Sequence, residues 1–184
     1  ERDRMTNLDM FSLEGRVALI PGGSGGIGSA LAAGLAGAGA KVAVLGRSKD
    51  ALDAAAAGVA AAGSEGLAVV GDATVDADAE RAVRETLARF GRLDIVVNAV
   101  GGGAGKVLHP AEAYPREAWD WIMELNVRST IVPTMPAVRA MIEGGNGGRV
   151  LHLSSVRGQL GIDNGFSAYV ASKHAVIGLT KSAA

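Results

Sequence analysis

The feature that most constrains the fold is a glycine-rich turn, Pro-Gly-Gly-Ser-Gly-Gly-Ile-Gly, at residues 21–28. It follows the apolar run 17–20 and leads into an alanine- and leucine-rich segment, 26–38, of helical character. Its glycines satisfy two spacings, G-x-G-x-x-G and G-x-x-x-G-x-G. Between a strand and a helix, such glycines permit a tight turn and let the backbone approach a pyrophosphate, while the helix N-terminus offers free N–H groups. The turn therefore predicts a dinucleotide site.

Short apolar segments alternate with longer helical ones along the rest of the chain. The predicted strands are residues 17–20, 41–45, 67–70, 93–97 and 149–153. The predicted helices are residues 26–38, 48–62, 76–90, 116–127 and 131–143, followed by a helix that contains Tyr169. Strands that are apolar throughout imply a parallel sheet covered on both faces. We expect a doubly wound parallel sheet of the α/β class, the three-layer α/β/α Rossmann fold, as one domain over residues 1–184 with a flexible tail at 1–10.

The composition excludes several other classes of protein. Of the 184 residues 48% are hydrophobic and 20% charged, as in soluble globular proteins. A net charge of −1 gives no general attraction to nucleic acid or membrane, so neither is an expected partner. The absence of cysteine excludes disulfides and a cysteine nucleophile, and a reducing cytoplasm is the expected location. Residues 17–40 are uncharged, but a proline and eight glycines interrupt them, which indicates soluble core rather than a membrane span.

A pair of residues near the end of the chain indicates proton chemistry. Tyr169 and Lys173 lie four residues apart in a helical segment, so their side chains share one face. A neighbouring cation stabilises a phenolate, which makes a tyrosine a usable proton donor and acceptor near neutrality. A lone Y-x-x-x-K pair is common by chance, so its meaning depends on the residues before it.

The end of the second predicted strand bears on the choice of dinucleotide. Gly46 stands where a carboxylate would bind an adenosine ribose, and Arg47 follows it. An arginine here can hold a 2′-phosphate through charge-assisted hydrogen bonds, which favours NADP. Asp50 lies close by and keeps NAD possible.

In order and spacing these motifs resemble the short-chain dehydrogenase/reductase family over nearly the whole chain. The G-x-x-x-G-x-G spacing is that of its single-domain members, Asp72 is similar to the aspartate that contacts adenine, and Asn98-Ala-Val-Gly101 to the N-N-A-G segment. The resemblance implies the following cofactor-binding set: Gly22, Ser24, Gly26, Ile27, Gly28, Arg47, Ser48, Asp72, Ala73, Asn98, Gly101, Tyr169 and Lys173.

The same resemblance implies a catalytic tetrad: Asn126, Ser155, Tyr169 and Lys173. Tyr169 would exchange a proton with the substrate oxygen while hydride moves to or from the nicotinamide. Lys173 would assist the tyrosine and hold the nicotinamide ribose, and Ser155 would hydrogen-bond the reacting oxygen. Asn126 would position a water that leads to solvent.

The chain departs from the family pattern in several places. Pro21 replaces a threonine, Ala99 replaces the second asparagine of N-N-A-G, and the spacing from Ser155 to Tyr169 is one residue longer than usual, which leaves Ser154 as an alternative serine. Family members continue past this helix through further strands and a substrate lid. We therefore expect the C-terminal strands to be missing and the 184-residue chain to be poorly active alone.

The leading hypothesis is an NADP-dependent oxidoreductase (NAD remaining possible) that interconverts a secondary alcohol and a carbonyl. A sugar acid or polyol and a 3-oxoacyl thioester both remain open as substrates. The alternative is a cofactor-binding sensor or scaffold without turnover. The resemblance also implies a homo-oligomer, a tetramer or dimer, formed through the helices at 131–143 and from 167 onward.

Other residues that could carry function receive structural interpretations. The three histidines, His109, His152 and His174, show no metal-ligand spacing, and no metal site is expected. A further group is interpreted as packing on a helix rather than as a base-stacking platform: Trp119 and Trp121, with Ile122 and Leu125.

Overall fold

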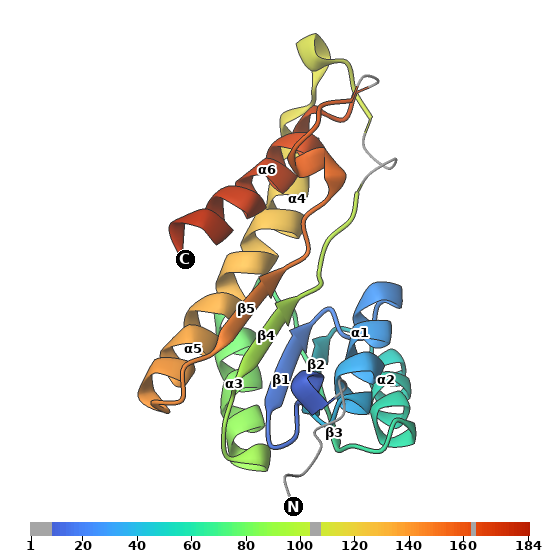
Figure 1. The fold of residues 1–184 in the computed structure, drawn as a ribbon. Coiled ribbons are helices and arrows are strands. Elements are labelled where there is room, and N and C mark those ends of the chain that lie inside the picture. The colour runs from blue at the N-terminus through green and yellow to red at the C-terminus, as the bar shows by residue number, and fades with distance from the viewer. Residues whose placement is uncertain (1–8, 104–107, 163–164) are drawn as a thin grey trace, which may run out of the picture.

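The computed structural model describes residues 9–103, 108–162 and 165–184. At its centre lies a sheet of five parallel strands, β1 (Val17–Pro21), β2 (Lys41–Gly46), β3 (Gly66–Val70), β4 (Ile95–Asn98) and β5 (Arg149–His152). The strand order is β3-β2-β1-β4-β5 (Figure 1). Because the order reverses between β1 and β4, the connections diverge there and leave a crevice at the carboxyl ends of the strands. The predicted doubly wound parallel sheet is confirmed.

Helices cover both faces of the sheet. On one face lie α1 (Gly26–Gly37) and α2 (Lys49–Ala61), and on the other α3 (Asp76–Phe90) and α5 (Ser129–Glu143) (Figure 1). Two more helices, α4 (Arg116–Met123) and α6 (Ser167–Ser182), pack against each other near the carboxyl end of the sheet. Short helical turns complete the described elements: η1 (Asp9–Phe11), η2 (Ala111–Ala113), η3 (Glu124–Arg128) and η4 (Val156–Gly158).

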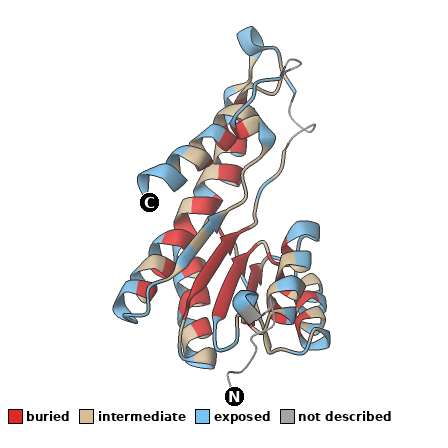
Figure 2. Ribbon diagram, in the orientation of Figure 1, coloured by how far each residue is buried: buried red, intermediate tan, exposed pale blue. Residues whose placement is uncertain are grey.

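The central strands are buried on both faces (Figure 2). Ile20 points into the apolar cluster under α1 and α2, and its neighbour Leu19 into the cluster under α3 and α5; both are fully buried. Burial of each such side chain contributes about 1.5–3 kcal/mol. The buried face of α1 consists of small residues, Gly28, Ala32 and Ala36, which allow the helix to lie close to the strands. The near-continuous apolar character of β1 and β2 thus follows from their two-sided burial.

The predicted boundaries agree with the observed strands to within two residues. The largest difference is at β4, which begins at Ile95 rather than residue 93, because Leu93 and Asp94 form the entry to the strand. Pro21 belongs to β1, where its carbonyl accepts a hydrogen bond from Ala99 N at 2.8 Å. The predicted tail at residues 1–10 lies outside the described residues except for positions 9 and 10, which are part of η1.

The helical region 116–143 differs from prediction. The sequence predicted two helices with a break at 128–130, but α4, η3 and α5 form one continuous helical run in which η3 is π-helical. Hydroxyl groups along α5 bond to carbonyls one turn earlier, Thr130 to Asn126 at 2.8 Å and Thr134 to Thr130 at 2.7 Å. The helix thus continues through the π turn, although α5 contains two residues that lack a backbone N–H, Pro133 and Pro136.

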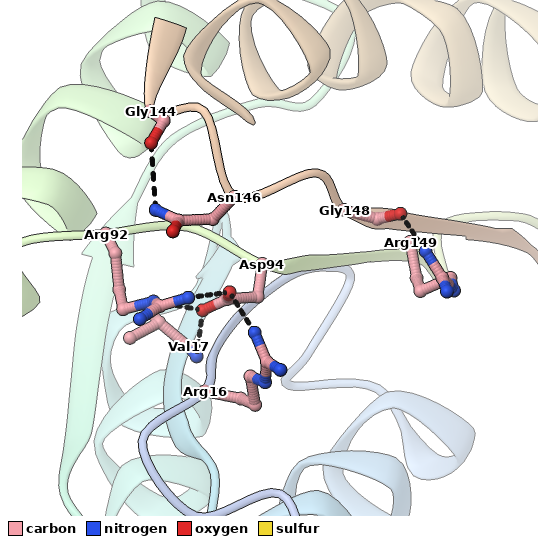
Figure 3. Close-up of polar contacts among 8 residues, drawn as sticks. All are labelled: Arg16, Val17, Arg92, Asp94, Gly144, Asn146, Gly148 and Arg149. Atoms are coloured by element: carbon pink, nitrogen blue, oxygen red, sulfur yellow. Dashed lines mark hydrogen bonds and ion pairs between the residues drawn. The ribbon is translucent and has the colours of Figure 1, made fainter. Parts of the chain in front are cut away.

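A buried carboxylate joins the strands at the amino end of the sheet (Figure 3). Asp94, 4% exposed, accepts hydrogen bonds from Arg92 Nε at 2.8 Å, Val17 N at 3.0 Å and Arg16 Nη1 at 3.1 Å. Its backbone pairs with Val17 O and Arg149 N, so one residue ties β1, β4 and β5 together. Burial opposes the charged form, but the hydrogen bonds from Arg92, Val17 and Arg16 outweigh it and hold the pKa of the Asp94 carboxyl below its usual value.

We predict that Asp94→Asn lowers the free energy of unfolding by about 2–3 kcal/mol near neutral pH, because hydrogen bonds to a charged group are lost. Since the folded-state pKa is depressed, the advantage of the wild type is present above the unfolded-state pKa of about 3.9 and disappears as pH falls through the folded-state value. Urea unfolding at neutral and acid pH measures both effects. The control Asp53→Asn changes an exposed i,i+4 ion pair and should cost under about 0.5 kcal/mol. Equal losses in the two variants would contradict the prediction.

Candidate active site

A cleft of about 350 Å³ opens at the carboxyl end of the sheet. Its walls come from the glycine turn, the ends of β2, β3 and β4, and the α4–η3 helix: Gly22, Ser24, Gly25, Leu45, Gly46, Arg47, Gly71, Asp72, Ala73, Thr74, Ala99, Val100, Gly101, Trp121, Glu124 and Leu125. The cleft lies at the point where the strand order reverses, which is where open α/β sheets bind ligands.

Close backbone contacts explain the glycines of the turn. A Cβ on Gly28 would lie 2.1 Å from Gly22 O, and one on Gly22, whose φ is 81°, would lie 2.6 Å from Val100 N. Only glycine therefore allows the turn to rest against α1 and the segment after β4. The N-cap of α1, Gly25, makes no side-chain cap, so the first N–H groups of the helix are left for an anion such as a pyrophosphate. The residues of the turn fit a dinucleotide.

Opposite charges meet at the end of the cleft formed by β2 and β3. Arg47, with 80% of its side chain exposed, places Nη1 3.9 Å from Asp72 Oδ2. The other carboxylate oxygen of Asp72 accepts from the backbone and hydroxyl of Thr74, at 2.9 and 2.8 Å. A Cβ on Gly46 would lie 2.7 Å from Ser24 Oγ, so a side chain there would require the serine hydroxyl to move. Gly46 offers no carboxylate to the cleft, and Arg47 and Asp72 are the charged residues of its lining at this end.

The amide of Asn126 links three parts of the chain. Asn126 is buried in η3, accepts from Gly102 N at 2.9 Å, and donates to Gly102 O and Ser172 Oγ, each at 3.1 Å. Its position in a π-helical turn is typical of functional sites. The side chain therefore holds the segment after β4 against α6. A Cβ on Gly101 would lie 3.0 Å from Asn126 Oδ1 and 3.1 Å from Lys173 Nζ, so these three residues converge.

Lys173 is a buried cation next to a tyrosine. It is 5% exposed, its Nζ donates to Leu153 O at 2.9 Å, and it lies 6.0 Å from the centroid of the Tyr169 ring. Burial lowers the pKa of the Lys173 ammonium. Tyr169 and Lys173, the predicted i,i+4 pair, are thus neighbours on α6, and the Lys173 ammonium lies at the end of β5.

The two adjacent serines have different surroundings. Ser154 Oγ donates to Lys173 O at 2.9 Å, which ties the loop after β5 to α6. Ser155 Oγ accepts from Arg157 N at 3.2 Å as the N-cap of η4, and its hydroxyl hydrogen remains available to a ligand. The insertion predicted after Ser155 lies partly in residues 163–164, outside the described residues.

Six predicted cofactor-binding residues line the cleft: Gly22, Ser24, Arg47, Asp72, Ala73 and Gly101. The other seven lie outside its lining: Gly26, Ile27, Gly28, Ser48, Asn98, Tyr169 and Lys173. Of these, Gly28 is buried beneath the turn, Ser48 caps α2, and Asn98 is buried at the end of β4. Ile27 is 67% exposed in the first turn of α1.

The structure also adds residues that the sequence did not indicate. Trp121 and Leu125, interpreted as helix packing, line the cleft, and Trp121 is 44% exposed. Trp121 does lie on a helix, α4, and this helix also turns one flank toward the cleft. The signal was present in the spacing: Trp121 and Leu125 are four apart and directly precede Asn126, so a helix that aims Asn126 at the site also brings these side chains near it.

With the geometry in place, comparison with known proteins identifies the family. Residues 16–184 match the family described as short chain dehydrogenase. The chain belongs to this family. The A-factor type gamma-butyrolactone 1'-reductase (1S-forming) of Streptomyces virginiae is 40% identical over 94% of the chain, and the sorbitol dehydrogenase of Cereibacter sphaeroides is 38% identical over 93%. The chain spans 66% and 64% of the lengths of these two relatives.

Solved structures of short-chain dehydrogenases share the architecture. A short-chain type dehydrogenase/reductase from Mycobacterium marinum superposes with a TM-score of 0.90 at 35% identity, over 98% of this chain and 72% of its own. An NAD⁺-bound xylitol dehydrogenase does so with a TM-score of 0.86 at 32% identity, over 93% of this chain and 64% of its own. The resemblance predicted from the motifs is confirmed.

The described residues contain neither a helix suited to span a membrane nor a cluster of metal-ligating side chains. Within residues 9–103, 108–162 and 165–184, no helix combines the length and apolar character needed to cross a membrane. In the same described part of the chain, no group of three or more His, Cys, Asp or Glu side chains is arranged to hold a metal ion.

We predict that Gly28→Ala lowers the free energy of unfolding by about 1–3 kcal/mol and abolishes dinucleotide binding, since the new methyl group overlaps backbone. The matched control is Gly34→Ala in the same helix, where a Cβ meets nothing within 4 Å. That substitution should stabilise the protein by about 0.5–1 kcal/mol. Thermal unfolding and a dinucleotide titration of both variants measure the contrast, and a harmless Gly28→Ala would contradict it.

Proposed function

We propose that the protein is an NADP-dependent oxidoreductase that interconverts a secondary alcohol and a carbonyl. The observation that carries this proposal is the convergence of Gly101, Asn126 and Lys173, with Tyr169 one helical turn away, beside a glycine-walled cleft. The named relatives are reductases and dehydrogenases, which supports the same class of reaction. Since the chain spans about two thirds of their length, the activity is proposed for the whole protein.

Each residue of the tetrad would have one task. Tyr169 would donate a proton to the substrate oxygen during reduction and accept one during oxidation. Lys173, whose ammonium is held by Leu153 O, would stabilise the phenolate and bind the ribose of the cofactor. Ser155 would donate its free hydroxyl hydrogen to the reacting oxygen, and Asn126 would keep the segment after β4 in place against α6. The cofactor supplies or accepts the hydride when bound.

NADP is proposed because of the charges at the β2 end of the cleft. The exposed guanidinium of Arg47 has only a 3.9 Å contact with Asp72, and a 2′-phosphate would offer it shorter, charge-assisted hydrogen bonds. NAD is the alternative, since Asp50 and Asp72 add negative charge nearby.

The class of substrate stays open between two candidates. The relatives include a gluconate 5-dehydrogenase of Gluconobacter oxydans and a 3-oxoacyl-[acyl-carrier-protein] reductase of Synechocystis, which act in the two classes that the sequence left open. We also infer a cytoplasmic homo-oligomer formed through α5 and α6, and two exposed apolar side chains on α5, Met135 and Ile142, support such a contact.

We predict that Arg47→Ala weakens NADPH binding about 10–100-fold and leaves NADH binding within about twofold, because one charge-assisted contact to the 2′-phosphate is lost. Fluorescence titrations with each cofactor measure this. The control Arg116→Ala removes an equally exposed arginine from α4 and should change neither affinity. Equal weakening of NADPH and NADH would show that Arg47 does not recognise the 2′-phosphate.

We predict that Tyr169→Phe in the full-length protein lowers kcat about 10²–10⁴-fold while NADPH still binds, since the substitution removes only the proton-transfer group. Turnover is measured on a panel that contains a polyol, a sugar acid and a 3-oxoacyl thioester. Tyr114→Phe, which keeps the ring contacts of Tyr114 with His109 and Trp119, is the control and should retain activity. A wild type that binds NADPH but turns over nothing on the panel would instead favour a sensor or scaffold.

A further inference from the structure

Buried polar groups form a continuous hydrogen-bonded ladder from α6 to β5. Ser172 Oγ donates to Tyr169 O and accepts from the Asn126 amide, and Thr130 Oγ1 donates to Asn126 O. The ladder continues through Thr134 and Asn98 and ends at His152 Nδ1, which lies 3.0 Å from Asn98 Nδ2. His152 is therefore connected to the tetrad although it lines no part of the cleft.

The direction of each bond in this ladder follows from donor and acceptor chemistry. Thr130 O can only accept, and Thr134 Oγ1 lies 2.7 Å from it, so the Thr134 hydroxyl hydrogen must point there. Thr134 Oγ1 then accepts from Asn98 Nδ2 at 2.9 Å. The second hydrogen of that amide nitrogen faces His152 Nδ1. His152 Nδ1 must consequently be an acceptor without a proton, which is the neutral Nε2–H tautomer.

The oxygen of the Asn98 side chain bears on which way the amide is turned. Asn98 Oδ1 is buried and has no hydrogen-bond partner among the described residues. Turning the amide over would place Oδ1 against Thr134 Oγ1, whose hydrogen is already given to Thr130, and would leave the buried NH2 group without a partner among the described residues. Only the contact with His152 could then be met, by an Nδ1–H, so the orientation with Nδ2 between Thr134 and His152 satisfies more groups. Protonation of His152 would place Nδ1–H against the amide N–H, and one contact of the ladder would have to break.

Lys173 depends on the same junction of β4 and β5. Leu153, directly after His152, donates its N–H to Asn98 O at 3.1 Å and accepts from Lys173 Nζ at 2.9 Å. The carbonyl that holds the Lys173 ammonium thus belongs to the residue between the His152 contact and Ser154, which itself binds Lys173 O. A change in the Asn98–His152 contact therefore displaces the residue next to Leu153, whose carbonyl holds the Lys173 ammonium.

Burial, rather than a charged neighbour, favours the neutral form of His152. Burial lowers the pKa of the His152 imidazole. The elements that pack against β5 are β4, α5 and α6. Strand β4 contributes no charged side chain, and Asp94 precedes it at the opposite end of the sheet. The ionisable residues on the other two helices are Arg139, Glu143, Tyr169, Lys173, His174 and Lys181, of which Lys173 alone is buried.

We propose that His152 is a positioning residue for Lys173: its neutral imidazole accepts the Asn98 amide hydrogen, and protonation of His152 uncouples the β4–β5 junction from the Lys173 ammonium. This rests on the proposed function, in which Lys173 binds the cofactor ribose. Cofactor binding then weakens as pH falls through the folded-state pKa of His152, which lies below the ordinary value of about 6.5.

The hydrogen bond itself is tested by ¹⁵N NMR of protein labelled at histidine and lysine, between about pH 5 and 8. His152 should show the Nε2–H tautomer at neutral pH, and the Lys173 side-chain amine signal should shift as His152 titrates. His174 is an internal control with the opposite tautomer, because its Nδ1 lies 2.9 Å from the carbonyl of Val170 and must donate. An Nδ1–H tautomer at His152, or a Lys173 signal indifferent to its titration, overturns the proposal.

The effect on the site is tested by NADPH titration near pH 7.5 and at a pH below the His152 midpoint that the NMR titration measures. His152→Asn keeps an acceptor, Oδ1, at the place of Nδ1 but cannot titrate, so it should bind as the wild type does at the higher pH. The wild type should lose about tenfold more affinity than this variant on acidification, the value of one hydrogen bond. His152→Leu, which has no acceptor, should bind about tenfold more weakly at both pH values.

His174→Asn should follow the wild type throughout. A purely structural role for His152 would leave the wild type and His152→Asn with the same pH dependence, and that result overturns the proposal. If His152→Leu does not fold, the comparison of the wild type with His152→Asn still decides. If none of the proteins binds NADPH at either pH, the proposed function fails, and the NMR experiment still decides the His152–Lys173 coupling.

Discussion

The buried amide of Asn126 is the contact on which the rest of the site depends. It lies where water cannot satisfy it, so its oxygen and nitrogen must find partners within the protein. Gly102 and Ser172 supply them, and in doing so they bring the end of β4 and helix α6 to the same helix. Because the amide itself is buried, losing one of these bonds would leave a buried polar group unpaired, and the amide thereby fixes the helix that carries Lys173.

The two ends of the sheet use buried polar groups for different purposes. At the amino end, the Asp94 carboxylate accepts hydrogen bonds from the guanidinium groups of Arg16 and Arg92, and its backbone pairs with residues of β1 and β5. These contacts contribute to stability and involve no residue of the cleft among those described. At the carboxyl end the polar groups are neutral amides and hydroxyls, with Lys173 as the buried charge. Because the buried groups around Lys173 are neutral, none of them cancels the charge of its ammonium. The ammonium can therefore act on a neighbouring phenol and on a bound ribose.

Much of the fold was predictable because local patterns and tertiary packing agree. The apolar runs at 17–20 and 41–45 are buried on both faces, and the glycine turn stands between strand and helix, where the backbone leaves no space for a Cβ at Gly22 or Gly28. The continuous helix through η3 was not predictable, since a π turn leaves no pattern of period 3.6.

The site was predictable where residues act locally and unpredictable where they act across the sheet. Tyr169 and Lys173 are neighbours on one helix, so their spacing was informative. Asn98 and His152 lie 54 residues apart and meet only because β4 and β5 pair in register. The distinction between Ser154 and Ser155 also depends on which of them meets α6, a contact that no sequence spacing displays.

The small-residue face of α1 has a consequence beyond its own packing. Gly28, Ala32 and Ala36 lie along one side of α1, and the N-cap of this helix, Gly25, lines the cleft. A bulkier side chain at Ala32 would push the middle of α1 away from the sheet and tilt its N-terminus. The free N–H groups would then move relative to the glycine turn. A substitution at a buried position that contacts no ligand would therefore change the affinity for a ligand as well as the stability of the core.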